Sequence, residues 1–146
     1  MIGLDSDLAD DLLNDYRHVT CEEIDSYDTL NSLFSNNIYN DIKIFHINIR
    51  SYYKNFDSLL ILLERLKIKF DIIVLSECWT DEDKLFVHLD GYDIFYTTGN
   101  FNRNDGIVCY SKTELGVLTK QITLGEAKGL TLDFHLPASP VAASAV

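Results

Sequence analysis

Long apolar runs are missing from this sequence of 146 residues, and none approaches the roughly 20 residues that span a bilayer. The N-terminal stretch MIGLDSDLADDLLND also lacks the basic and apolar regions of a secretory signal. Cysteine is scarce: Cys21, Cys78 and Cys109 stand far apart without a CxxC pair, which argues against a zinc or disulfide framework. These absences predict no membrane partner and an intracellular protein with reduced thiols, in the nucleus or the cytoplasm.

Positive charge is the second scarcity. The chain has 12 Lys and Arg against 23 Asp and Glu, a formal net charge of −11. Residues 1–30 contain nine acids and one base (−8), so the remaining residues contain fourteen acids and eleven bases (−3). Phosphate contacts require Lys and Arg, so an acidic chain is a poor candidate for nucleic-acid binding. The nearly balanced remainder leaves that function open.

Two regions of different composition follow one another. Residues 1–40 are rich in Asp, Ser and Asn, which predicts an acidic, flexible leader with possible short helices over 8–16 and 27–34. Residues 41–146 carry the patterns of one folded α/β domain. We therefore expect a domain boundary near residue 41.

The front of this domain reads as strand, helix, strand. DIKIFHINI (41–49) and DIIVLSE (71–77) are near-continuous apolar runs, which fit strands covered on both faces. Between them, NFDSLLILLERLKIKF (55–70) is predicted to be a helix, with Asn55 as the expected N-cap. One face of this helix is apolar and consists of Phe56, Leu59, Leu60, Leu63 and Leu66. Four more strands are predicted in DGYDIFYTT, GIVCYSK, GVLTKQITL and GLTLDFHL.

A crossover through a helix makes the first two strands parallel, and ligands collect where parallel strands end. Asn48 closes the first strand and Glu77 follows the second, so both should lie at one edge. Carboxylate and amide oxygens are hard ligands that suit Mg²⁺, Mn²⁺ or Ca²⁺. The alternative is that Glu77 is an ordinary surface residue and Asn48 caps a turn.

Four motifs add a family resemblance. They are Asn48-Ile49-Arg50-Ser51, Leu75-Ser76-Glu77-Cys78-Trp79, Gly91-Tyr92 and Gly106-Ile107-Val108-Cys109-Tyr110. In order and spacing, residues 41–146 resemble the N-terminal half of an endonuclease/exonuclease/phosphatase domain. The closer resemblance is to the apurinic-type endonuclease in the reverse-transcriptase polyprotein of non-LTR (LINE-like) retrotransposons.

The resemblance implies a four-layer α/β sandwich, truncated before its C-terminal half, that hydrolyses DNA with a divalent metal. Glu77 would hold a weakly bound Mg²⁺ (or Mn²⁺), and Asn48 would support the metal and the scissile phosphate. Arg50, Trp79 and Arg103 are possible DNA contacts. For the two arginines the alternative is an ordinary surface role, and for Trp79 it is packing that anchors its loop.

The chain also departs from the family. Asp105-Gly106 stands where paired glycines are frequent, and the later Tyr-Arg, Asp-x-Asn and His elements are absent. We therefore expect a partial domain that is inactive as this chain and that self-associates through exposed sheet edges. Two other functions stay open: a non-catalytic interaction module whose acidic leader binds a basic partner, and a phosphatase of the same superfamily.

Overall fold

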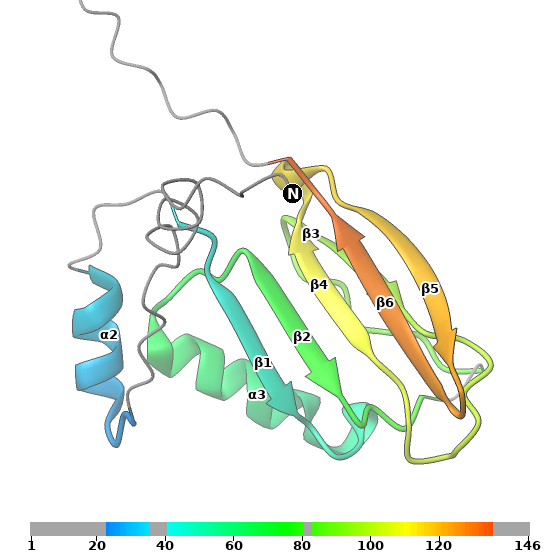
Figure 1. The fold of residues 1–146 in the computed structure, drawn as a ribbon. Helices are drawn as coiled ribbons and strands as arrows, with labels where there is room; N and C mark the ends of the chain where they lie inside the picture. The colour runs from blue at the N-terminus through cyan, green and yellow to red at the C-terminus, as the bar shows by residue number, and fades with distance from the viewer. Residues whose placement is uncertain (1–22, 36–40, 81–82, 136–146) are drawn as a thin grey trace, which may run out of the picture.

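The computed structural model describes residues 23–35, 41–80 and 83–135, and these form a mixed α/β structure with two α-helices and two sheets (Figure 1). The helices are α2 (Tyr27–Ser35) and α3 (Tyr52–Leu66), with a short 3-10 turn at Thr113–Leu115. The strands are β1 (Ile44–Asn48), β2 (Ile72–Ser76), β3 (Tyr92–Tyr96), β4 (Val108–Lys112), β5 (Leu118–Leu124) and β6 (Ala127–Asp133). The predicted α/β class is confirmed. The possible helix over 8–16 lies outside the described residues.

The first sheet has the order β1-β2-β4-β3. β1 and β2 are parallel and joined by α3, as the strand–helix–strand pattern predicts, and their register ends on the pair Asn48 and Ser76. β4 runs antiparallel to both β2 and β3. The second sheet is the β5–β6 hairpin. No helix in the described part of the chain is long and apolar enough to cross a membrane.

Helix α3 begins earlier than predicted. It starts at Tyr52 rather than after Asn55, and Ser51 at the N-cap position makes no capping hydrogen bond with its side chain. The expectation that Asn55 is the N-cap is therefore wrong. The Asn55 side-chain amide instead donates to the carbonyls of Ile49 and Arg50, each at 2.8 Å, and so fixes the loop that precedes the helix.

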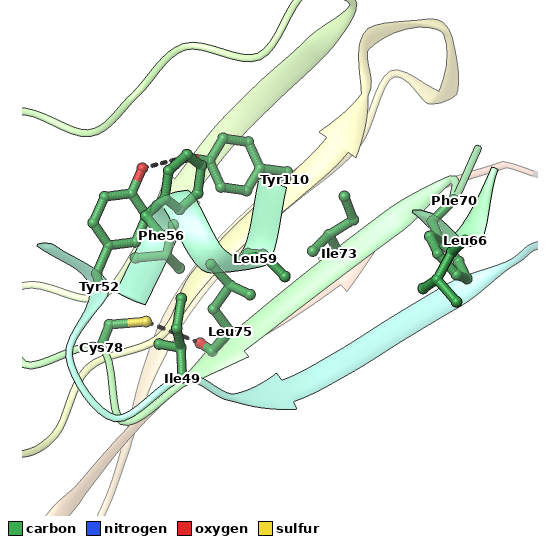
Figure 2. Packing of buried hydrophobic residues seen from close by; sticks show 11 residues of the cluster. Ile49, Tyr52, Phe56, Leu59, Leu66, Phe70, Ile73, Leu75, Cys78 and Tyr110 are labelled. Atoms are coloured by element: carbon green, nitrogen blue, oxygen red, sulfur yellow. Dashed lines mark hydrogen bonds between the residues drawn. The ribbon is translucent and has the colours of Figure 1, made fainter. Parts of the chain in front are cut away.

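The core lies between α3 and the first sheet. Figure 2 shows Tyr52, Phe56 and Leu59 of the helix packed over Leu75 and Tyr110 of the sheet. Burying side chains of this size contributes about 1.5–3 kcal/mol each. The spacing of these residues is what makes α3 amphipathic.

Both described cysteines are buried, as expected of small hydrophobic residues. Cys78 lies in the core under α3, where its thiol donates to the Leu75 carbonyl at 3.3 Å (Figure 2). Burial raises the pKa of Cys78 to about 12 and that of Cys109 to about 11. Both are therefore neutral, unreactive thiols near pH 7.

Helix α2 packs on the core although it falls within the expected leader. Leu30 and Phe34 contact the core cluster, and the Phe34 ring meets the edge of Phe70 with centroids 6.0 Å apart. The Asn31 amide also reaches the Arg65 carbonyl at 3.5 Å. Residues 1–22 and 36–40 lie outside the described residues, so the boundary near residue 41 stays a prediction.

The two faces of the first sheet are covered differently. α3 lies on one face and the β5–β6 hairpin on the other (Figures 1 and 2). On the hairpin side, Cys109 and Ser111 of β4 are buried, whereas Ile44 of β1 is 58% exposed and His46 and Asn48 are exposed. The apolar run of β1 predicted cover on both faces. The structure differs, because the hairpin lies over β3 and β4 and leaves β1 open.

Candidate functional site

The carboxyl ends of β1 and β2 form one rim, defined here as residues 48–52 and 76–80. Their arrowheads lie side by side at the lower edge of Figure 1. Beyond the strands the two segments stay hydrogen-bonded: the amides of Ile49, Ser51 and Tyr52 donate to the carbonyls of Ser76, Glu77 and Cys78 at 3.0, 2.9 and 2.8 Å. The predicted proximity of residues 48 and 77 along the backbone is therefore confirmed.

A third segment, residues 105–107, holds the rim from the other side. The amides of Cys78 and Trp79 donate to the carbonyls of Gly106 and Asp105 at 3.0 and 2.9 Å. Gly106 has φ +114, and a Cβ there would lie 2.9 Å from Thr80 Oγ1. Only glycine fits this position without displacing the rim. This explains the glycine of the fourth sequence motif.

The rim is also the strained part of the backbone. Five non-glycine residues have positive φ in the described part of the chain, and four of them lie in the rim: Arg50 (φ 45), Ser51 (86), Glu77 (50) and Trp79 (51). Each such conformation costs on the order of 1–3 kcal/mol, and such residues cluster at functional sites. The sequence gives no signal for this strain, because none of the four is Gly or Asn.

The side chains offer one carboxylate and one amide. Asn48 Oδ1 accepts the Arg50 amide hydrogen at 3.2 Å, and the Glu77 side chain is exposed. No residue in the described ranges forms an ion pair with Glu77. Within the same ranges no three His, Cys, Asp or Glu side chains gather around a common point. This donor set fits a weakly held, largely hydrated Mg²⁺ or Mn²⁺ and does not fit a closed zinc or calcium cage.

His46 lies beside this donor set. It lies two residues before Asn48 on the same open face of β1, and its Nε2 is 3.1 Å from Ser76 Oγ. The contact runs diagonally from His46, two residues before the end of β1, to Ser76, the last residue of β2. It ties the side chains of the two strands together next to the rim.

A hollow of about 890 Å³ opens next to the rim and contains two of the three predicted DNA contacts. Trp79 is 39% exposed and lines it together with Arg103, Lys54 and Tyr53. Arg50 is exposed on the rim but is not among the residues that line this hollow. Trp79 is therefore partly packed in its loop and partly open to the hollow.

Sequence reasoning missed a second hollow, of about 720 Å³, which shares Thr80, Lys84 and Arg103 with the first. Its apolar wall includes Phe86 and Tyr96, whose ring centroids lie 4.7 Å apart. The one available signal was the density of aromatic residues in DGYDIFYTTGNF. The pattern alone does not reveal that Phe86 comes to face that strand.

Asn48, Glu77 and Trp79 thus lie on one strained rim. Trp79 and Arg103 also line the same hollow beside it. Comparison with known proteins finds no matching family model, no matching curated protein and no matching solved structure.

Proposed function

We propose that residues 41–135 provide the metal-binding part of a divalent-metal-dependent DNA endonuclease, of the apurinic type found in non-LTR retrotransposons. The observation that supports this most directly is the rim, where Asn48 and Glu77 stand on adjacent segments of strained, firmly hydrogen-bonded backbone. The four-layer sandwich belongs to the same proposal. The two sheets and the covering helix α3 are compatible with part of it.

The rim residues have distinct tasks in this proposal. The Glu77 carboxylate would hold the metal, which when bound supplies Lewis-acid polarisation of a phosphoryl oxygen. Asn48 Oδ1 already accepts the Arg50 amide hydrogen, so its Nδ2 is the group that can donate to a phosphate oxygen. Because the backbone of the rim is fixed by its hydrogen bonds, the backbone that carries both groups is in place before the substrate arrives.

We further propose that residues 1–146 do not cleave DNA by themselves. Hydrolysis also needs a group that positions the nucleophile and one that accepts its proton, and general acid–base catalysis contributes about 10²- to 10⁴-fold. The family elements that supply these groups are missing from the sequence, and groups that act as a unit lose most of their effect together. We expect no nicking of supercoiled plasmid with Mg²⁺ or Mn²⁺. Nicking that disappears in Glu77→Ala would show this expectation to be wrong.

Metal binding at the rim can be tested without activity. Mn²⁺ should broaden the NMR signals of residues 48–51 and 77–79, and Glu77→Gln should abolish the broadening because it removes the single carboxylate. Glu64→Gln, a matched change at an exposed position on α3, should leave the broadening intact. Broadening confined to the acidic residues 1–30 would overturn the assignment of the metal to the rim.

A further inference from the structure

The two hollows adjoin beside the rim, and we treat them together as one groove. The tryptophan hollow is lined by Trp79, Tyr53 and Lys54, and the tyrosine hollow by Tyr96, Phe86 and Phe101. They meet at Thr80, Lys84 and Arg103, which line both. A ligand that enters one hollow can therefore extend into the other without leaving the surface.

Among the described residues that line the groove, cations outnumber carboxylates. These residues include Lys54, Lys84 and Arg103 against Asp83, whereas the whole chain has a net charge of −11. Arg103 is exposed at the junction and forms no ion pair with any residue in the described ranges. A local positive surface on an acidic protein favours an anionic ligand.

Aromatic rings line the groove at both ends and are incompletely covered. Trp79 is 39% exposed, Tyr96 is 47% exposed and Phe101 is 56% exposed. Cations already lie over neighbouring rings: Lys84 Nζ is 4.9 Å from the centroid of Tyr53, and Lys128 Nζ is 4.8 Å from that of Phe101. Rings interleaved with cations suit a ligand that alternates flat groups with negative charges.

The walls of the groove are held in place by hydrogen bonds. The Asn100 amide donates to Thr80 Oγ1 at 2.9 Å, which connects the two loops at the junction. Gln121 of β5 accepts the Thr98 amide hydrogen at 2.8 Å and donates to the Thr98 carbonyl at 3.1 Å. The groove is therefore formed before any ligand binds, which reduces the entropy lost on binding.

We propose that this groove binds an unpaired nucleic-acid strand. Bases stack on Trp79 and Tyr96, and the phosphates between them lie along Lys54 and Arg103. A duplex keeps its bases stacked on one another and does not offer them to these rings, so the groove selects single strands. The inference goes beyond the proposed endonuclease function, because binding needs neither the metal nor cleavage.

Trp79 is the only tryptophan of the chain, so its fluorescence reports on the groove directly. In EDTA and at low salt, a short oligodeoxyuridylate or oligouridylate should quench this fluorescence, and the more effective of the two identifies the preferred sugar because the base is the same. Quenching by neither would overturn the proposal. So would equal competition from a duplex of the same length.

Variants separate stacking from charge. In the anisotropy of a labelled oligonucleotide, Trp79→Ala and Tyr96→Ala should each weaken binding about 5- to 150-fold, and Trp79→Phe should restore most of the loss. Arg103→Ala should reduce the slope of log K against log salt by about one. Tyr27→Ala, at an exposed ring on α2, is the matched control and should bind like wild type.

Failure of this proposal is distinguishable from failure of the metal site. Glu77→Gln should retain full binding in EDTA, because the carboxylate lies outside the groove lining. Unchanged binding in both Trp79→Ala and Tyr96→Ala would overturn the stacking role, whatever the outcome at the rim.

Discussion

Gly106 is a single residue on which both the rim and the groove depend. Its carbonyl accepts the Cys78 amide hydrogen, and its α-carbon faces Thr80, which lines both hollows. A Cβ would lie 2.9 Å from Thr80 Oγ1 and 3.4 Å from Asn100 Nδ2, the two atoms that are hydrogen-bonded to each other. The backbone at φ +114 is also one that L side chains rarely adopt.

Gly106→Ala should therefore lower the free energy of unfolding by about 1–3 kcal/mol through backbone strain, with a further loss from displacing Thr80. Urea denaturation measures this change. Gly99→Ala is the matched control, since Gly99 also has positive φ (+60) but no atom within 4 Å of the new Cβ. If both variants lose the same stability, the contact with Thr80 has no energetic role.

At the scale of elements, one ring of hydrogen bonds joins α3, β4 and the segment around Val87. The Val87 amide donates to Tyr52 Oη of α3 at 2.9 Å, the Tyr52 hydroxyl donates to Tyr110 Oη of β4 at 2.6 Å, and the Tyr110 hydroxyl donates to the Val87 carbonyl at 2.8 Å. Burial raises the pKa of both tyrosines, so they stay protonated as this ring requires. The ring holds the segment around Val87 against the core, and this segment includes Phe86, which lines the groove.

Tyr110→Phe should break this ring: the Val87 carbonyl loses its donor and the Tyr52 hydroxyl loses its acceptor, while Tyr52 Oη still accepts the Val87 amide hydrogen. The expected loss of unfolding free energy is about 1–3 kcal/mol, the cost of buried polar groups that lose their hydrogen bonds. Urea denaturation measures it, and amide hydrogen exchange at Val87 should accelerate. Tyr96→Phe, which removes an exposed hydroxyl, should change stability by less than about 0.5 kcal/mol. Equal losses in the two variants would contradict this account.

The sequence predicts the helices and strands better than it predicts which strands pair and which groups their side chains contact. The apolar spacing of Phe56, Leu59 and Leu66 was sufficient to identify α3, and the crossover rule placed residues 48 and 77 together. The start of α3 was not predictable, because the Asn55 side chain donates to the carbonyls of Ile49 and Arg50 in the preceding loop instead of capping the helix. The insertion of β4 between β2 and β3 was also missed, since tertiary packing decides which strands are adjacent.

The candidate site shows the same division. A parallel crossover brings strand ends together whatever their side chains are, so the position of Glu77 followed from general topology. The left-handed backbone of Glu77 could not be predicted in this way, because hydrogen bonds to segments remote in the sequence hold an ordinary residue in that conformation. The groove was not predicted for a related reason. Trp79 and Tyr96 line adjoining hollows only because the loops fold together, which the sequence pattern does not show.

At the scale of the whole molecule, β1 is both an edge strand and an uncovered one. It pairs only with β2 in the first sheet, and Ile44 on its open face is 58% exposed. An edge strand exposes unpaired backbone groups and is a template for pairing with another chain, and Ile44 adds an apolar contact beside the polar His46 and Asn48. Self-association of the protein through β1 is therefore a proposal that the described residues favour.

We expect a concentration-dependent dimer in sedimentation velocity, weakened by Ile44→Lys because the new charge would be buried in the contact. Leu124→Lys is the control, since Leu124 is 66% exposed at the end of the β5–β6 hairpin, away from β1. A wild-type protein that stays monomeric at every concentration would contradict the expectation, and so would an equal effect of Leu124→Lys.

The β5–β6 hairpin makes its cross-strand pairs within itself, and Gln121 bonds it to Thr98 in the loop that follows β3. It can therefore lift away as a unit while the ladder of the first sheet stays intact. Cys109 faces the side that the hairpin occupies, whereas Cys78 is sealed beneath α3. The rate at which an alkylating reagent modifies Cys109 then measures how often the hairpin opens locally. Modification of Cys78 instead requires unfolding of the core under α3.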